Sequence, residues 1–263
     1  MKYQTILVDE TNSIATITLN SIEKLNSLGL QMMREITLAC DEIERAGKAR
    51  VIILTGAGRA FCAGADIGDL SKTVALKPAE MEPSLKAWFK FLWRIKSIEL
   101  PTIAAVNGQA LGGGFALAIA CDMRIAADDA KVGAVFVKRG ASSADMGMSW
   151  LLPRIVGAGW AAELMFTGDI IDASKGEVIG LFNHVVPRDR LMQAAMELAA
   201  KLAAGPPLGL KFTKRALNRS IWEGLQGQLE YESATQTLTF LSEDFQEGLK
   251  SFFEKRNAVF QGR

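Results

Sequence analysis

Three consecutive glycines, Gly112 to Gly114, separate a short apolar run from a longer apolar run with helical character. Glycine is a poor helix former, so three of them at the start of a helix require a structural or chemical reason. The preceding run, PTIAAVNG, predicts a buried strand. This sequence of buried strand, glycine turn and helix constrains the fold more than any other feature of the chain.

The same arrangement occurs once earlier in the chain. The run RVIILTG predicts a buried strand, which leads into Gly56–Gly68, a loop rich in glycine and alanine. Helices are predicted over Leu28–Ala46, which ends at Gly47, and over the aromatic run SLKAWFKFLWRIKSI. Strands and helices that alternate in this way favour an α/β core.

Four further segments complete the prediction. The runs YQTILVD and IATITLN predict a hairpin, since the polar stretch ETNS separates them, and MRIAADDAKVGAV predicts two short strands. Ser71–Pro83 has weak periodicity and two prolines, which indicates an irregular, mobile segment. From about Arg188 the chain is almost entirely helical. We therefore predict an α/β core over residues 1–190 and a helical C-terminal region over residues 191–263.

Composition excludes several classes of function. The 263 residues carry a net charge of +1, which argues against a dedicated nucleic-acid surface. Three cysteines without a CxxC spacing make a disulfide framework or zinc site improbable, and one histidine excludes chemistry that needs several. The N-terminus lacks an apolar signal core, and no apolar run is long enough to cross a membrane, so a cytoplasmic location is expected.

The two glycine-rich turns indicate how the protein contacts a ligand. Backbone N–H groups in such turns are free to point at an oxygen. Neither turn fits a nucleotide motif, because Phe61 occupies the last glycine of a GxGxxG pattern and GGGFAL lacks the Lys-Ser/Thr of a P-loop. Two turns that each offer N–H groups suit an oxyanion hole, which binds one carbonyl oxygen from two sides.

Four segments in colinear order resemble the crotonase superfamily, also called the enoyl-CoA hydratase/isomerase family. They are GAGRAFCAGADI, PTIAAVNGQALGGGFALAIACDMRIA, SWLLPRIVGAGWAAELMFTGDIIDA and FFEKRNAVFQG. The resemblance implies a ββα-spiral core, a C-terminal helical trimerisation region that forms trimers or dimers of trimers, and an acyl-CoA thioester substrate. Coenzyme A would be part of that substrate, and no metal, nicotinamide or flavin motif indicates a separate cofactor.

The resemblance also implies roles for particular residues. By position, the N–H groups of Ala63 and Gly113 would form the oxyanion hole. The residues aligned with the coenzyme A groove are Lys24, Ala63, Asp66, Ile67, Phe252 and Lys255. The last two match tail residues that in the family often reach the adenosine phosphates from a neighbouring subunit.

The acids that family hydratases use are missing. Hydration requires one group to deprotonate water and a partner to handle the second proton, and family hydratases use two glutamates for this. Here those positions hold Ala116 and Phe136. Ordinary 2-enoyl-CoA hydration is therefore not expected.

One candidate acid remains, Asp145, in the pattern DxGxSWLLP, which is most similar to ring-epoxide isomerases of phenylacetate degradation. A single carboxylate suffices for double-bond isomerisation, because it can remove a proton and return it to another carbon. Alternatively, Asp145 caps the helix that begins near Met148. Two other functions stay open: a hydratase or C–C hydrolase with non-standard acids, in which Ser142 or Ser143 holds water, and an acyl-CoA-binding protein without catalysis.

Several other residues have two interpretations each. An aromatic group can wall an acyl pocket or form an ordinary core face; it comprises Trp88, Phe89, Phe91, Leu92 and Trp93. His184 and Cys62 are interpreted as structural.

Overall fold

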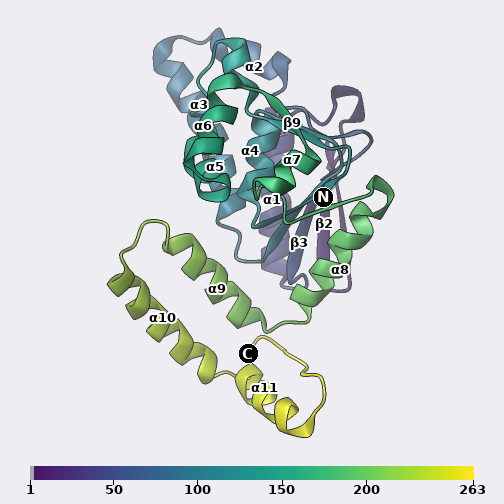
Figure 1. The fold of residues 1–263 in the computed structure, drawn as a ribbon, viewed down its shortest axis with the longest axis vertical. Coiled ribbons are helices and arrows are strands. Elements are labelled where there is room, and N and C mark those ends of the chain that lie inside the picture. The colour runs from purple at the N-terminus through teal and green to yellow at the C-terminus, as the bar shows by residue number, and fades with distance from the viewer. Residues whose placement is uncertain (1–2) are drawn as a thin grey trace.

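The computed structural model describes residues 3–263 and places them in two stacked sheets surrounded by helices (Figure 1). The larger sheet has the strand order β1-β2-β3-β5-β7-β10. Its strands are Ile6–Thr11, Ile14–Leu19, Val51–Gly56, Thr102–Val106, Met123–Ala127 and His184–Val186. The smaller sheet has the order β4-β6-β8-β9, with strands Ala60–Cys62, Gln109–Leu111, Lys131–Gly133 and Ile170–Asp172.

The chain builds these sheets as a spiral of repeated turns. Each turn adds one strand to the large sheet, one to the small sheet and then a helix: β3-β4-α2, β5-β6-α4 and β7-β8 with the helices that follow. Neighbouring turns pair in parallel, with Ile53 beside Ile103 in the large sheet and Ala110 beside Val132 in the small sheet. This confirms the predicted α/β fold with a ββα-spiral core.

Eleven α-helices surround or extend this spiral in residues 3–263. They are α1 Leu30–Ala46, α2 Ile67–Val74, α3 Pro78–Lys96, α4 Gly113–Ala120, α5 Met148–Val156, α6 Ala158–Thr167, α7 Ala173–Val178, α8 Leu191–Ala203, α9 Pro207–Arg219, α10 Leu225–Phe240 and α11 Glu243–Glu254. Three short 3-10 helices are η1 Ile22–Lys24, η2 Val135–Arg139 and η3 Arg188–Arg190. No helix of the described residues is both long and apolar enough to span a membrane.

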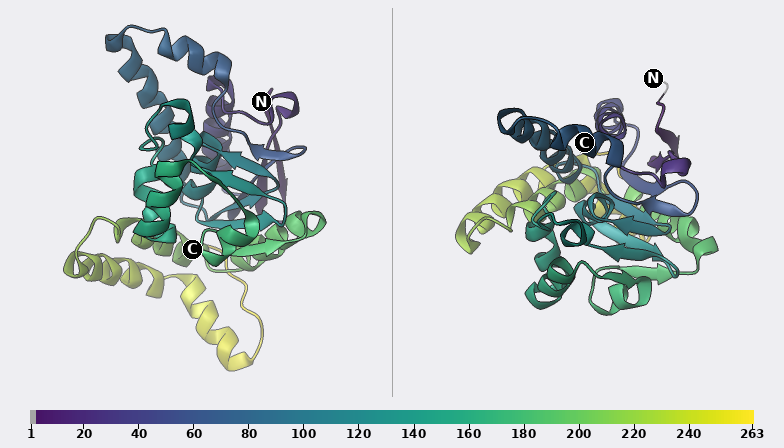
Figure 2. Two further views of the ribbon diagram at one scale, coloured as in Figure 1. Left: turned by 45° about the horizontal axis from the view of Figure 1, so that its top comes forward. Right: turned by 90° about the horizontal axis from the view of Figure 1, so that it is seen from above.

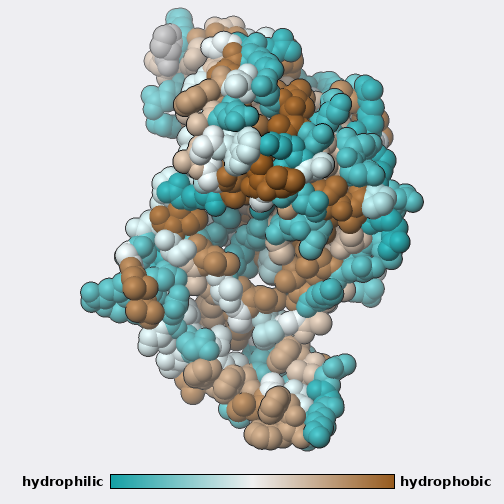
Figure 3. Space-filling model, viewed as in Figure 1, coloured by the Kyte–Doolittle hydropathy of each residue, from teal (hydrophilic) through white to brown (hydrophobic). Residues whose placement is uncertain are grey.

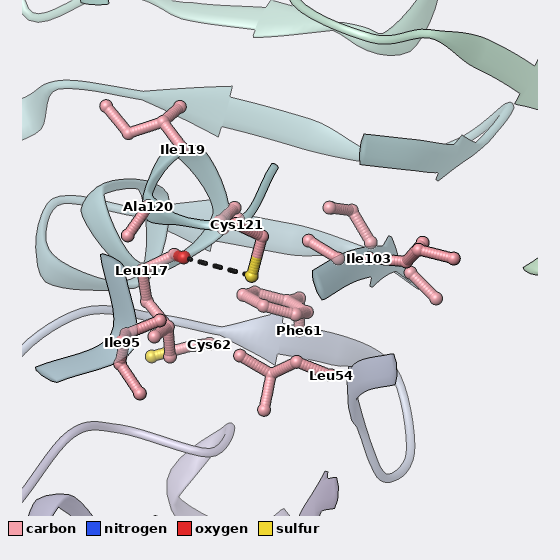
Figure 4. Close-up of a cluster of buried hydrophobic side chains, with 14 of the residues drawn as sticks. Leu54, Phe61, Cys62, Ile95, Ile103, Leu117, Ile119, Ala120 and Cys121 are labelled. Carbon is pink, nitrogen blue, oxygen red and sulfur yellow. Dashed lines mark hydrogen bonds between the residues drawn. The ribbon is translucent and has the colours of Figure 1, made fainter. Parts of the chain in front are cut away.

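The core fills the space between the sheets and the helices. The short helix α4 is buried along its whole length and lies among side chains from both sheets (Figure 4). The buried side chains Phe61, Leu117 and Ile103 each come from a different part of the spiral, namely β4, α4 and β5. A helix that is apolar on all sides is typical of such a central position.

Local patterns predict most elements correctly. The hairpin β1–β2 is antiparallel, with Asn12 and Ser13 at positive φ in its turn, and α1 ends at Gly47 in the left-handed conformation. The prediction of irregular structure for Ser71–Pro83 is wrong, since α2 continues to Val74 and α3 begins at Pro78. Proline is favoured in the first helical turn, where its missing N–H has no partner to bond.

The C-terminal helices divide differently from the predicted boundary at residue 190. Helix α8 packs against β3, β5 and β7 with Leu191, Ala195 and Ala199 buried, so it belongs to the core. Helices α9, α10 and α11 form an arm that stands apart from the core (Figures 1 and 2). Ion pairs at its base hold the arm in place, among them Lys214 to Asp122 at 2.7 Å. The use of this arm for oligomerisation remains a prediction.

Candidate active site

The three glycines before α4 have different surroundings. Gly112 caps the helix with φ +50°, a conformation that disfavours other residues. A Cβ on Gly114 would lie 2.1 Å from the carbonyl oxygen of Cys62, so only glycine lets α4 pack against β4. A Cβ on Gly113 would instead meet the sulfur of Met146 at 3.1 Å, the end of a flexible side chain. Gly112 and Gly114 are therefore structural, whereas Gly113 faces an adaptable surface.

Two backbone N–H groups converge beside this surface. Gly113 is the first residue of α4, and the first N–H groups of a helix have no partner within it. The N–H of Ala65 donates no hydrogen bond within residues 3–263, and its nitrogen lies 3.9 Å from the Cβ position of Gly113. Both groups are therefore available to a ligand, and the dipole of α4 favours negative charge near Gly113.

Ala63 is not one of these donors, so the prediction of its N–H group in the oxyanion hole is wrong. Its N–H donates to the carbonyl of Leu25 at 3.0 Å, and Asp66 N–H donates to the carbonyl of Leu28 at 2.8 Å. Leu28 and Ala65 form an isolated parallel bridge between the two segments. Because hydrogen bonds alternate along such a pairing, the N–H of Ala65 is left to point away from it.

Two buried asparagines that sequence reasoning missed hold this region in position. Asn26 donates from Nδ2 to the carbonyls of Ala57 at 2.9 Å and Ala60 at 2.8 Å. Asn107 accepts the N–H of Gly56 at 3.0 Å through Oδ1. Both fix the path of the chain into β4, which leads to Ala65. The visible signal was an asparagine within each apolar segment, LNSL and AVNG, where a buried amide needs partners.

We expect Asn107→Ala to lower the free energy of unfolding by roughly 2–4 kcal/mol, because it leaves buried backbone groups without partners. Turnover should also fall, since the chain into β4 positions the N–H of Ala65. Thermal unfolding followed by circular dichroism, with steady-state rates measured on the folded fraction, checks both effects. A variant as stable as the original would show that Asn107 does not hold this segment.

The positions of the missing acids do lie beside the glycine turn. Ala116 is fully buried in α4, and the ring of Phe136 in η2 lies 3.7 Å from the Cβ position of Gly112. Neither side chain can carry a proton. The structure therefore has apolar groups at both positions where family hydratases have glutamates.

Asp145 lies in the loop that packs against this turn. The neighbouring residue Met146 is buried, and its sulfur lies 3.1 Å from the Cβ position of Gly113, so the Asp145 loop packs against the glycine turn. Its Oδ1 accepts the N–H of Met146 at 2.8 Å. Burial raises the pKa of the Asp145 carboxyl above its ordinary value, with the Met146 N–H acting weakly in the opposite direction. A carboxyl of this kind is suited to proton transfer.

The alternative role of Asp145 as a helix cap is wrong. Helix α5 begins at Met148, its N-cap is Gly147, and no side chain donates to or accepts a bond at that cap. Ser143 is also committed elsewhere, because its hydroxyl is buried and donates to the carbonyl of Met165 at 2.8 Å. Ser142 is exposed and accepts the N–H of Ala144.

The residues predicted for coenzyme A binding separate into two groups. Lys24 and Asp66 form an ion pair of 2.9 Å, which raises the pKa of Lys24 and lowers that of Asp66, and the side chain of Ile67 is 72% exposed next to them. Asp66 and Ile67 follow Ala65 directly in the chain, and the ion pair brings Lys24 to them. Phe252 and Lys255 lie on and just after α11 at the opposite end of the molecule (Figure 1). One chain therefore does not bring the two groups together.

The remaining candidates lie outside the site. His184 begins β10, an edge strand, and is exposed. Cys62 is buried, and this burial raises the pKa of its thiol to about 12, so it stays protonated. The described residues contain no cluster of His, Cys, Asp and Glu that could hold a metal ion.

The chain is thus a spiral of ββα turns in which Ala65 and Gly113, at two glycine-rich turns, have N–H groups without a hydrogen-bond acceptor in residues 3–263. Residues 9–263 match the family model described as enoyl-CoA hydratase/isomerase. The chain therefore belongs to the enoyl-CoA hydratase/isomerase family, whose members act on acyl-CoA thioesters.

Individual relatives include both reaction types. The chain is 38% identical over 264 residues to a protein of Mycobacterium tuberculosis named "Probable enoyl-CoA hydratase", with 100% of each covered. It is 35% identical to the 1,2-epoxyphenylacetyl-CoA isomerase of Escherichia coli, with 98% of each covered. A crystal structure of an enoyl-CoA hydratase subunit of Geobacillus kaustophilus superposes with a TM-score of 0.93 at 37% identity, with 100% of both chains covered.

Proposed function

We propose that the protein isomerises a double bond of an enoyl-CoA thioester, with Asp145 as the single acid and base. The observation that carries the proposal is the set of ionisable groups at the glycine turn. The two positions of the hydratase glutamates are Ala116 and Phe136, whereas Asp145 lies in the loop whose Met146 contacts Gly113. One carboxylate can move a proton, but it cannot both activate water and protonate carbon in one step.

The mechanism follows from this arrangement. The thioester oxygen accepts hydrogen bonds from the N–H groups of Ala65 and Gly113. The carboxylate of Asp145 removes a proton from the acyl chain, and the electron pair moves onto the thioester oxygen to form an enolate. The paired N–H groups bind this oxygen more strongly as its charge develops, which lowers the barrier. The protonated Asp145 then returns the proton to a different carbon, so the double bond moves and no atom is gained or lost.

Two observations support isomerisation over the alternatives. Burial raises the pKa of Asp145 above that of an ordinary aspartate, which suits a group that first accepts a proton and then returns it. The similarity to an epoxyphenylacetyl-CoA isomerase extends over nearly the whole chain, and that protein's name describes an isomerisation without net addition of water. A protein that only binds thioesters would not need two N–H groups directed at developing charge.

Proton exchange in heavy water tests the proposal. The protein is incubated with β,γ-unsaturated and saturated acyl-CoA thioesters, and deuterium uptake and double-bond position are followed by mass spectrometry and NMR. We expect deuterium in the acyl chain and migration of the double bond, without a gain in mass from water. Net hydration would show that the reaction is that of a hydratase and would refute the isomerase proposal.

We further propose that the arm assembles three copies into a trimer or a dimer of trimers. Large apolar side chains are exposed along it, including Leu225 at 76%, Leu241 at 80% and Phe253 at 78% (Figure 3). An exposed apolar surface of this kind marks a contact site. Assembly would also allow Phe252 and Lys255 of one copy to reach the coenzyme A groove of another.

We expect light scattering after gel filtration to give the mass of three or six chains. Leu241→Glu should shift the protein toward monomer, because it places a charge in a buried apolar contact. Leu7→Glu is the matched control, since Leu7 is exposed on the edge strand β1 of the core. A monomeric original protein would contradict this proposal.

A further inference from the structure

A second cavity, about 740 Å³ in volume, lies where α3, α5 and the base of the arm meet. Its volume is within the usual range for small-molecule sites. Aromatic side chains dominate its walls: Phe89 and Trp93 from α3, and Trp150 stacked on Trp222 at 4.6 Å. The larger hollow of the molecule lies within the arm, between α9, α10 and α11, and does not reach the glycine turn.

The aromatic cavity adjoins the catalytic loop. Gly147 lines it and follows Asp145 and Met146 in the chain. The Cβ position of Gly147 lies 2.9 Å from Cδ2 of Leu92, and Met146 extends from the same loop to Gly113. The flexible side chains of Met146 and Leu92 therefore lie next to Gly113 and Gly147, respectively, where the glycine turn and the cavity approach each other. An acyl chain whose thioester lies at Gly113 can pass into the cavity when they shift.

The far wall of the cavity carries a cation. Phe89, Leu92, Trp93 and Lys96 are spaced at three and four residues, so they form one face of α3. Lys96 lies four residues beyond Leu92, about 6 Å farther along the helix axis. A ligand that enters past Leu92 toward Lys96 therefore passes the ring of Trp93.

Lys96 lacks a carboxylate of its own. Asp122 lies 3.7 Å from Lys96 but only 2.7 Å from the buried Lys214, so the two lysines share it. Burial lowers the pKa of Lys96, Asp122 offsets this only in part, and the like charge of Lys214 lowers it further. A lysine paired with a carboxylate of its own would have a raised pKa.

A second pair of cations beside Lys96 also shares one carboxylate. Arg215 also lines the cavity, and its partner Glu99 pairs with Lys211 as well. Cationic groups therefore outnumber carboxylates at this wall. The resulting excess of positive charge favours the binding of an anionic ligand.

From this geometry we propose that the acyl group of the substrate is bulky and ends in a carboxylate, so that its apolar body fills the aromatic cavity and its far end pairs with Lys96. The substrate class is then the monothioester of an unsaturated dicarboxylic acid. This inference rests on the proposed function in one respect, because it places the thioester at Ala65 and Gly113.

The test compares pairs of coenzyme A thioesters with the same carbon skeleton, one ending in a methyl group and one in a carboxylate. Saturated esters are used, and their binding is measured by titration calorimetry, so that the result does not depend on any reaction. We expect the original protein to bind the carboxylate ester at least tenfold more tightly. Lys96→Met should abolish that preference and leave binding of the methyl ester unchanged.

The matched control is Lys90→Met, which removes an exposed charge from the same helix and should keep the full preference. If Lys96→Met does not fold, Lys96→Gln gives the same comparison, because it removes the charge and keeps a donor toward Asp122. Equal binding of the two esters by the original protein, or a preference that survives in the folded Lys96 variant, would overturn the inference. Failure of the isomerase proposal would appear separately, as absence of proton exchange with the unsaturated esters.

Discussion

Replacing Asp145 with asparagine is expected to lower kcat by about 10²–10⁴-fold, because the proposed reaction has no other group to carry the proton. The binding of a saturated thioester should stay within a few-fold of the original value, since the amide matches the carboxyl in size and its Oδ1 can still accept the N–H of Met146. Rates are measured with the ester that shows double-bond migration, and binding is measured by calorimetry. Full turnover in the variant would remove Asp145 from the mechanism.

The stability of the same variant gives an independent result. The pKa of Asp145 is raised by burial, so the folded state holds its proton more tightly than the unfolded state. The cost of burying its charge is therefore present above the folded pKa and disappears as the pH falls through it. Asparagine carries no charge to bury. We therefore expect Asp145→Asn to unfold at a higher temperature than the original protein at neutral pH and at the same temperature at low pH.

A structural role for Asp145 would give the opposite stability result, namely a variant that is less stable at neutral pH.

The raised pKa of Asp145 also predicts how the rate depends on pH. A base must be deprotonated, so the acidic limb of the kcat/KM profile should lie above the pH that an ordinary aspartate gives. A limb at the usual aspartate position would show that another group controls the rate.

The sequence predicts the spiral well, because its elements depend on local patterns. Apolar runs bounded by turn residues identify β3 and β5, and Gly47 marks the end of α1. The tail is different, because its helical periodicity does not show what each helix packs against. Leu191, Ala195 and Ala199 of α8 are buried by the large sheet, whereas the apolar residues of α10 in the arm stay exposed.

The site was predicted only in part for a similar reason. Gly113 stands out in the sequence because three consecutive residues that form helices poorly precede an apolar helix, and Asp145 stands out as the remaining acid. The choice between Ala63 and Ala65 depends on which N–H groups the segment near Leu25 uses, and that segment is distant in sequence. The aromatic group of α3 likewise divides only in three dimensions: Trp88, Phe91 and Leu92 are buried, whereas the more exposed Phe89 and Trp93 line the cavity.

Gly113→Pro tests the paired N–H groups directly. Proline removes the N–H of Gly113 and is favoured at the first position of a helix, where no intrahelical bond is lost. One such donor is worth roughly 10²–10³ in kcat, so we expect a loss of this size with Asp145 intact. Because the lost bond strengthens as the enolate forms, the effect should fall on kcat more than on the binding of a saturated ester.

Gly113→Ala is the matched control, because alanine retains the N–H group. Its Cβ would lie close to the sulfur of Met146 at 3.1 Å, which can move away, and at ordinary contact distances from Leu28 and from the nitrogen of Ala65. The two variants therefore differ chiefly in one hydrogen-bond donor, and circular dichroism establishes that each is folded. If the proline variant keeps the rate of the alanine variant, Gly113 does not bind the thioester oxygen. If both lose activity equally, the space at Gly113, rather than its N–H group, is what the reaction needs.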